Sequence, residues 1–139
     1  MINSFDGKYA FLSNYYDNPV TYNGLTYLNN EAAFHAQKTL DLEERKLFTT
    51  LQPGKAKRLG RKIKLRSDWE DVKVNIMYEI CKCKFTQNNI LRQMLIDTGD
   101  KILVEGNYWN DTFWGVCNGV GENNLGIILM KIRGEINES

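Results

Sequence analysis

The stretch that most constrains the fold is residues 68–88, with the sequence DWEDVKVNIMYEICKCKFTQN. Its apolar side chains recur at helical spacing, at positions 69, 72, 76, 77, 80 and 85. Asp68 precedes them in the position that favours a helix N-cap. A helix of this length with one apolar face must bury that face. The pattern therefore predicts that the longest helix of the chain lies here and faces the core.

The chain before residue 30 has the pattern of strands and turns. KYAFL at 8–12 is followed by the turn-forming sequence SNYYDNP. TYNGLTYL at 21–28 places Asn23 and Gly24 between β-branched and aromatic residues, which is typical of a two-residue hairpin turn. We therefore expect a small amino-terminal β-hairpin or sheet.

After residue 30 most of the pattern is helical. NEAAFHAQKTL at 30–40 is rich in helix formers. Asp41 stands at capping-box spacing before Glu44, and Pro53 suits the first turn of a third, short helix. Further along, the sequence predicts a helix at 88–99 that stops at Gly99, a short strand at 101–106 and a closing helix at 123–136.

The charge balance gives no reason to expect a polyanion or an anionic membrane as partner. The 139 residues carry 18 basic and 17 acidic side chains, which nearly cancel. The start, MINSFDGKYAF, is too polar for a signal peptide, and no stretch has the ~18 apolar residues of a membrane span. We therefore expect one cytoplasmic domain over residues 1–139 that contacts no membrane, and its oligomeric state stays open.

The cysteines are Cys81, Cys83 and Cys117, an odd number in a chain without an export signal, so we expect reduced thiols. A metal site made by these three and His35 is a formal alternative. However, Cys81 and Cys83 stand two residues apart in a predicted helix, where their side chains point to different faces. We therefore interpret the cysteines as small core residues and expect no metal or other cofactor.

Polar groups of three kinds share one stripe of the first predicted helix. Glu31, His35 and Lys38 are spaced at i, i+4 and i+7, so they project from roughly the same face. One interpretation is a solvated face with a weak Glu31–His35 pair. The other is one wall of a functional site, which needs a second surface.

The segment EGNYWNDTFWGV at 105–116 has the chemistry for such a surface. It follows a predicted strand and combines Trp109 and Trp114 with Asn107 and Asp111. Tryptophan faces stack on a base, while carboxamide and carboxylate groups bind its polar edge or ribose hydroxyls. The alternative is that the tryptophans only fill the core. The basic stretch at 55–66 offers phosphate-binding chemistry, although such a run is usually a solvated face.

Together these motifs resemble the YbiA-like family, also called NADAR. The resemblance extends over nearly the whole chain and in order, through FLSNYY, EAAFHAQK, AKRLGR, LRSDW, KF, TGD, EGNYWNDTFWGV and NNLGIILMKIR. It implies a helix-rich α+β single domain that hydrolyses the N-glycosidic bond between ribose and a base. Substrates linked to the family are ADP-ribose on guanine, in nucleotide or nucleic acid, and phosphoribosylamino-pyrimidine intermediates of riboflavin synthesis. A non-catalytic module that binds ADP-ribose or a nicotinamide dinucleotide is the alternative from another class.

The resemblance also assigns roles to residues. Glu31 and Asp111 are the expected acid–base pair, and Lys38 is the expected nucleophile that forms a Schiff base with the sugar. The expected substrate contacts are Trp114, Asn107 and Trp109, with Phe11, Ser13 and Asn14 in the pocket wall and Arg61 at a phosphate. His35 and Tyr15 depart from the residues frequent in the family, which are glutamine and phenylalanine, so substrate choice can differ here.

Overall fold

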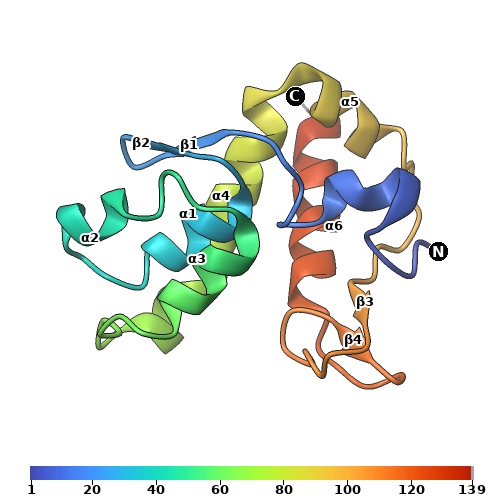
Figure 1. Cartoon of the computed structure of the whole chain (residues 1–139). Coiled ribbons are helices and arrows are strands. Elements are labelled where there is room, and N and C mark those ends of the chain that lie inside the picture. Colours follow the sequence, from blue (N-terminus) through green and yellow to red (C-terminus); the bar gives the residue numbers. More distant parts are fainter. Residues whose placement is uncertain (139) are drawn as a thin grey trace. The chain divides into compact units, whose positions relative to one another are not determined.

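The computed structural model describes residues 1–138, which form two compact units. One unit is residues 14–87, and the other combines residues 1–13 with the chain from residue 88 onward. Each unit contains helices and one pair of short strands (Figure 1). The fold class is therefore the helix-rich α+β arrangement that the family resemblance implies.

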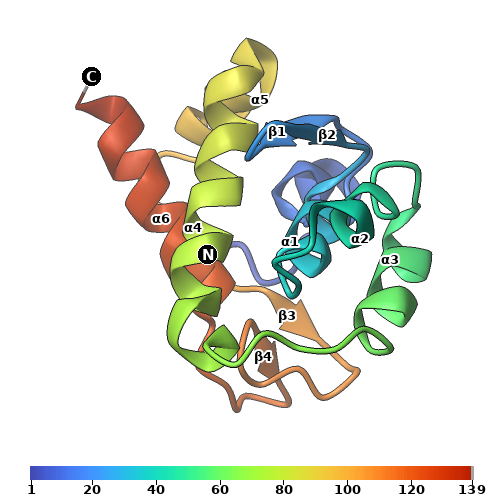
Figure 2. The same cartoon turned by 90° about the vertical axis from the view of Figure 1, so that its left-hand side faces the viewer.

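The unit of residues 14–87 contains the hairpin and four helices. The first helix lies against the third and the fourth, and the first strand packs against the fourth helix (Figure 2). The elements are β1 (Val20–Tyr22), β2 (Leu25–Tyr27), α1 (Asn30–Ala36), α2 (Leu42–Lys46), α3 (Pro53–Gly60) and α4 (Trp69–Gln87).

The predicted hairpin is confirmed. β1 and β2 pair antiparallel, with Val20 opposite Tyr27, and both of these residues are fully buried. The turn residues Asn23 and Gly24 have φ values of 50° and 83°. Two positive φ angles in a two-residue loop define a type I′ turn, whose twist matches that of the strands.

The helix predicted at 30–40 is shorter than expected, because α1 ends at Ala36. Its start is fixed by Asn29, whose Oδ1 accepts a hydrogen bond from the amide of Ala32 at 2.7 Å. At its end the amides of Gln37 and Lys38 bond to carbonyls three residues back, so Lys38 stands in a turn beyond the helix. Asp41 caps α2 as predicted, by accepting from the amide of Glu43 at 3.1 Å.

The prediction of a long core-facing helix is confirmed by α4. It is 19 residues long and buries Trp69, Ile76, Met77, Ile80 and Phe85. Asp68 does precede the helix, but its two carboxylate oxygens bind Arg66 at 2.6 and 2.9 Å.

The unit that combines residues 1–13 with the chain from residue 88 holds a 3₁₀ helix, two α-helices and two short parallel strands. α5 packs against α6, which confirms the closing helix predicted from the sequence. The elements are η1 (Gly7–Leu12), α5 (Asn89–Ile96), β3 (Gly106–Asn107), β4 (Val116–Cys117) and α6 (Asn124–Asn137).

Two strand predictions are wrong in this unit. Residues 8–12 lie in η1, where the amides of Tyr9 and Ser13 donate to the carbonyls of Asp6 and Ala10, three residues back, instead of to a neighbouring strand. Residues 101–106 pair with the amino-terminal segment at one position only, the bridge between Ile2 and Leu103. Of these residues only Gly106 lies in a strand, because β3 begins there and pairs with β4.

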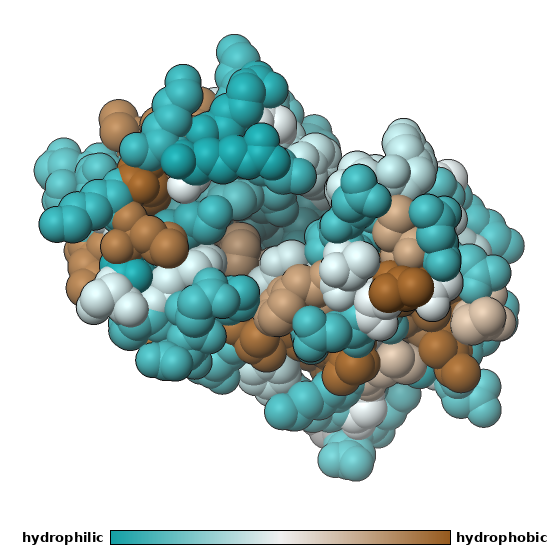
Figure 3. Space-filling model, turned by 90° about the horizontal axis from the view of Figure 1, so that it is seen from below, coloured by the Kyte–Doolittle hydropathy of each residue, from teal (hydrophilic) through white to brown (hydrophobic). Residues whose placement is uncertain are grey.

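Exposed apolar side chains are dispersed over the chain. Leu40, Leu42 and Leu47 surround α2, Ile90 begins α5, and Tyr108 follows β3. On the face in Figure 3, apolar side chains lie in separate groups between polar ones. Among residues 1–138, no helix has the length and apolar character needed to cross a membrane. Cys81 and Cys117 are buried and Cys83 is half-buried, all as free thiols.

Candidate active site

An acid, an imidazole and an amine are close together at α1. Glu31 lies in the first turn of the helix, and its Oε2 is 3.1 Å from Nε2 of His35. The side chains of His35 and Glu31 are only 8% and 13% exposed. This burial contradicts the interpretation of the stripe as a solvated helix face. Lys38 stands in the turn that follows, near enough for its charge to interact with Glu31.

The surroundings of Lys38 lower the pKa of its amine. Its Nζ lies 5.9 Å from the ring centroid of Trp69, a buried residue. The Trp69 ring is tilted by 56° against that of Phe34, with 5.0 Å between the centroids. Burial lowers the pKa of Lys38; Glu31 opposes this change, while Arg61, Lys57 and Lys73 add to it. A lysine with a lowered pKa is neutral more often, and only the neutral amine is a nucleophile.

Arg61 belongs to the same electrostatic neighbourhood. It directly follows α3, is exposed, and acts through its charge on both Lys38 and Tyr15. Burial and then Glu31 raise the pKa of Tyr15, and Arg61 and Arg58 oppose that rise. An anionic ligand bound near Tyr15 would therefore interact with the positive charge of both arginines. The phosphate contact of Arg61 stays a prediction.

Asn14 supports the start of α1. Its backbone carbonyl accepts a hydrogen bond from the amide of Glu31 at 3.1 Å. Its buried side chain donates to Sδ of Met77 at 3.4 Å and accepts from Nδ2 of Asn30 at 3.3 Å. The polar atoms of this predicted wall residue are thus used within the protein, where they fix the position of Glu31.

The loop at 105–116 is organised by the side chain of Asn107. Its Oδ1 accepts from the amides of Trp109 and Asp111 at 3.3 and 3.1 Å. Its Nδ2 donates to the carbonyl of Asp111 at 2.9 Å and to the carboxylate of Glu105 at 3.1 Å. This predicted substrate contact is therefore also the residue that holds the loop together.

Asp111 forms a second local support. Its Oδ1 accepts from the amides of Phe113 and Trp114 at 3.1 and 2.9 Å, the pattern of an Asx-turn. One carboxylate oxygen is thus committed to the loop. The acid role of Asp111 stays a prediction, and it would use the other carboxylate oxygen.

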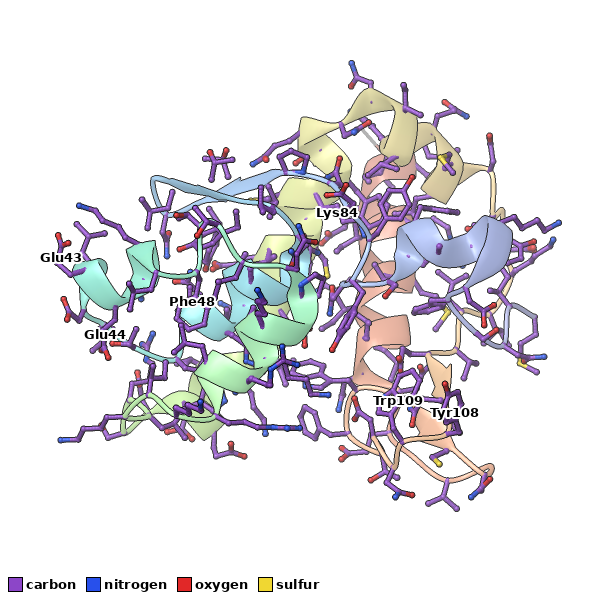
Figure 4. All side chains as sticks on the ribbon, in the orientation of Figure 1. Glu43, Glu44, Phe48, Lys84, Tyr108 and Trp109 are labelled. Atoms are coloured by element: carbon purple, nitrogen blue, oxygen red, sulfur yellow. The ribbon has the colours of Figure 1, made fainter. Side chains whose placement is uncertain are left out.

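The aromatic residues of the loop do not all fill the core. Trp109 is 52% exposed and Tyr108 is 88% exposed, and their rings meet edge to face at 5.1 Å. Figure 4 shows the two side chains next to each other on the loop beside β3 and β4. Trp114 is half-buried and its ring contacts that of Phe113 at 4.8 Å. Core filling therefore does not explain Trp109, and an exposed ring on a braced loop is suited to stacking.

Phe11 and Ser13 lie at the end of η1. Phe11 is buried and borders a surface hollow of about 190 Å³. The other residues around this hollow are Tyr9, Met94, Asp97, Thr98 and Lys101. Ser13 caps η1, with its amide donating to the carbonyl of Ala10 at 2.9 Å.

The predicted site residues thus fall into two sets. Glu31, Lys38, Arg61 and Asn14 belong to the unit of residues 14–87, while the remaining set is Phe11, Ser13, Asn107, Trp109, Asp111 and Trp114. Sequence reasoning placed Trp69 in the core and gave neither Trp69 nor Gly60 a role in the site, although Trp69 lies near Lys38 and Gly60 lies against His35. Their only sequence signal was membership of the LRSDW and AKRLGR motifs.

Comparisons with known proteins agree on one family. The family model of the NADAR domain matches residues 3–137. The chain is 37% identical to N-glycosidase YbiA of Shigella flexneri serotype 5b over 96% of this chain and 85% of that protein. It is 36% identical to a riboflavin biosynthesis protein of Vibrio vulnificus, again over 96% of this chain but over only 37% of that protein.

The structure comparison leads to the same family. The NMR structure of the Escherichia coli protein YbiA superposes with a TM-score of 0.86 at 33% sequence identity, and covers 99% of this chain and 88% of that one. A match of the family model to nearly every residue, with relatives above 30% identity along the same length, is more specific than any single motif. The chain belongs to the NADAR domain family.

Proposed function

We propose that the chain is an N-glycosidase that hydrolyses the bond between a ribose and a base. One observation carries this proposal: a half-buried lysine with a lowered pKa lies within electrostatic reach of a carboxylate that a histidine holds in place. Covalent catalysis at a sugar carbon requires a nucleophile, such as an amine, and a group nearby that accepts its proton. Membership of a family that includes proteins named N-glycosidase supports the same chemistry.

In the proposed reaction the neutral amine of Lys38 attacks C1′ of the ribose. The C1′–N bond breaks, its electron pair goes to the base, and the departing base takes up a proton. Ring opening then breaks the C1′–O4′ bond, O4′ takes up a proton, and an imine joins Lys38 to C1′. Water adds to the imine carbon and the amine leaves, which releases the sugar and restores Lys38.

Glu31 moves protons in this scheme. It accepts the proton that the Lys38 nitrogen loses after the attack, and it returns one when the amine leaves. Its negative charge also stabilises the positive charge that develops on the sugar. By the family resemblance, Asp111 protonates the departing base and Trp114 contacts it.

We propose ADP-ribose on guanine as the preferred substrate. Arg61 acts through its charge on Lys38 and Tyr15, and Arg58 acts on Tyr15, so a diphosphate beside these groups would meet positive charge. In the other unit, the exposed ring of Trp109 offers the flat apolar surface that stacking on a planar base needs. A phosphoribosylamino-pyrimidine is the second candidate. It is supported by relatives named riboflavin biosynthesis proteins, among them the Vibrio protein and the chloroplastic protein PYRR of Arabidopsis thaliana, which is 40% identical over 65% of this chain.

The test is a substrate panel with purified protein. ADP-ribosyl-guanosine and a phosphoribosylamino-pyrimidine are incubated separately, and release of the free sugar phosphate is followed by chromatography. Borohydride is then added during turnover, because it reduces an imine to a stable adduct that peptide mass spectrometry assigns to a residue. Lys38→Ala is compared with Lys46→Ala, which removes an exposed lysine from α2 in the same unit.

We expect faster release from ADP-ribosyl-guanosine, an adduct on Lys38, and loss of both in Lys38→Ala but not in Lys46→Ala. Turnover that persists in Lys38→Ala would exclude the amine route and leave the chemistry to Glu31 and Asp111. Saturable binding of ADP-ribose with no product from either substrate would show a binding module instead of an enzyme.

A further inference from the structure

The ring of His35 is enclosed on α1. The side chain is buried, and its edge meets the ring of Phe34 at 5.6 Å between centroids. On another side lies Gly60, the last residue of α3, where an added Cβ would stand 2.5 Å from Nδ1 and 2.9 Å from Cγ of His35. The imidazole therefore occupies space that a side chain at position 60 would need.

The two ring nitrogens of His35 have different surroundings. Nε2 is 3.1 Å from Oε2 of Glu31, whereas Nδ1 is buried and has no hydrogen-bond partner in the part of the chain that the structure describes. A proton on Nδ1 would be a buried N–H without an acceptor, which costs free energy, while a proton on Nε2 has a carboxylate to bind. Of the two neutral tautomers, the one with its proton on Nε2 is therefore favoured.

This tautomer fixes Glu31. Its Oε2 is held by the His35 N–H, while none of the described residues donates a hydrogen bond to Oε1. The backbone of Glu31 is held separately by the Asn14 carbonyl. The carboxylate is thus immobilised at one oxygen and leaves the other for proton transfer.

We infer that His35 is a positioning residue for Glu31, donating from Nε2 to one carboxylate oxygen so that the other faces the reaction. The inference rests on the proposed glycosidase function only for its kinetic consequence. The hydrogen bond, the tautomer and the part played by Gly60 are properties of the folded protein and are measured without substrate.

The first test is spectroscopic. His35 is the single histidine of the chain, so a long-range ¹H–¹⁵N correlation spectrum of the folded protein contains one imidazole. At mildly basic pH we expect a directly bonded proton on Nε2 only, and a shift of that nitrogen in Glu31→Gln but not in Glu43→Gln, which changes an exposed acid of α2. A proton bonded to Nδ1, or an Nε2 chemical shift that is the same in the wild type and in Glu31→Gln, would overturn the inference.

The second test is kinetic. The nitrogen of a glutamine side chain at position 35 reaches Glu31 and donates as Nε2 does, whereas leucine fills the space without a donor. Relative to His35→Gln, we expect His35→Leu to lower kcat roughly ten- to hundredfold, the range seen when the outer partner of a metal ligand is lost, with KM unchanged. Equal kcat values for the two variants, or an effect on KM alone, would overturn the positioning role.

The two tests separate the inference from the proposed function. If the wild-type protein cleaves none of the substrates in the panel, the glycosidase proposal fails, and the spectrum alone decides whether His35 holds Glu31. If turnover is seen and the kinetic comparison shows no difference, the positioning role fails while the glycosidase proposal stands.

Discussion

The backbone amide of Arg66 donates to the carbonyl oxygen of Lys38 at 2.9 Å, so the segment that leads into α4 holds the turn carrying the proposed nucleophile. The guanidinium of Arg66 adds a bond from Nη1 to the carbonyl of Gln37 at 3.3 Å. Nε and Nη2 bind the two oxygens of Asp68, which orients the planar group. Carbonyls that the end of α1 leaves unpaired are thus satisfied by a residue far along the sequence.

Replacing Arg66 should therefore shift the backbone turn that carries Lys38, although the Arg66 side chain makes no contact with the Lys38 amine in the hydrogen bonds described above. Arg66→Ala keeps the backbone bond but loses the guanidinium contacts, and we expect the melting temperature to fall by a few degrees together with a lower kcat. Arg66→Lys should recover little, because an ammonium group does not reproduce the two-nitrogen contact with Asp68. Thermal unfolding and initial rates check this, and an Arg66→Lys variant that behaves like the wild type would show that charge alone is sufficient.

The contact between Gly60 and His35 gives a prediction with an internal control. Gly60→Ala places a methyl group against the imidazole, so we expect a loss of stability of roughly 1–3 kcal/mol and a slower reaction. Gly54→Ala, in the same helix, meets only the flexible end of Arg58 at 3.6 Å and should be neutral or stabilising by up to about 1 kcal/mol. Denaturant unfolding of both variants measures the difference. Equal stabilities would mean that the ring moves aside freely.

The pKa of Lys38 predicts how the rate depends on pH. Because the proposed nucleophile is the neutral amine and burial lowers the pKa of Lys38, kcat should rise with pH around a midpoint below the ordinary 10.5. Arg61→Gln removes a charge that lowers this pKa, so the midpoint should move up. Glu31→Gln removes the charge that raises it, so in any residual activity the midpoint should move down. Rate profiles of the three proteins provide the check, and shifts in the same direction would contradict the assignment to Lys38.

The elements that the sequence predicted well are those whose cause is local. The helix at 69–87 follows from the spacing of its apolar residues, and the hairpin follows from Asn23 and Gly24, which accept positive φ. The family resemblance and the helix-rich α+β class are also confirmed. The strand predicted at 8–12 is absent, and the one predicted at 101–106 is present only from Gly106 onward. A strand depends on a partner elsewhere in the chain, and residue composition does not report whether that partner exists.

The candidate site was only partly predictable for a related reason. The spacing of Glu31, His35 and Lys38 put them on one face, and the structure brings Glu31 and His35 into contact. Trp69 and Gly60 touch this group from positions distant in sequence, which periodicity does not reveal. Asn107 and Asp111 show another limit, because their side chains bind backbone amides of their own loop. An asparagine or aspartate has the same sequence signature whether it supports a loop or contacts a ligand.

The structure of the loop at 105–116 therefore predicts different effects of substitutions at Asn107 and Trp109 on stability. Asn107→Ala removes the hydrogen bonds that shape the loop, so both stability and substrate affinity should fall. Trp109→Ala removes an exposed ring, so KM should rise severalfold while unfolding is unchanged. Asn107→Asp is the matched variant: it keeps the acceptor oxygen but puts a second carboxylate at the position now 3.1 Å from that of Glu105, and we expect it to be no better than alanine. A stable, active Asn107→Asp protein would contradict this account of the loop.

Lys84 should make stability depend on pH. It is fully buried in α4, with its amine 5.6 and 5.1 Å from the rings of Tyr16 and Phe85. Burial lowers its pKa to about 8 from 10.5, and the neighbouring Cys81 opposes this change. Between these two values the unfolded chain binds a proton that the folded protein does not, so stability should rise with pH by up to about 1.4 kcal/mol per unit.

Lys84→Met isolates this contribution, because methionine fills similar space and does not titrate. Denaturant unfolding of both proteins across the same pH range gives the test, and the difference between them cancels the titration of other groups. We expect the wild-type protein to gain stability relative to Lys84→Met as pH rises above about 8. A constant difference would mean that Lys84 keeps its proton inside the folded protein over the whole range.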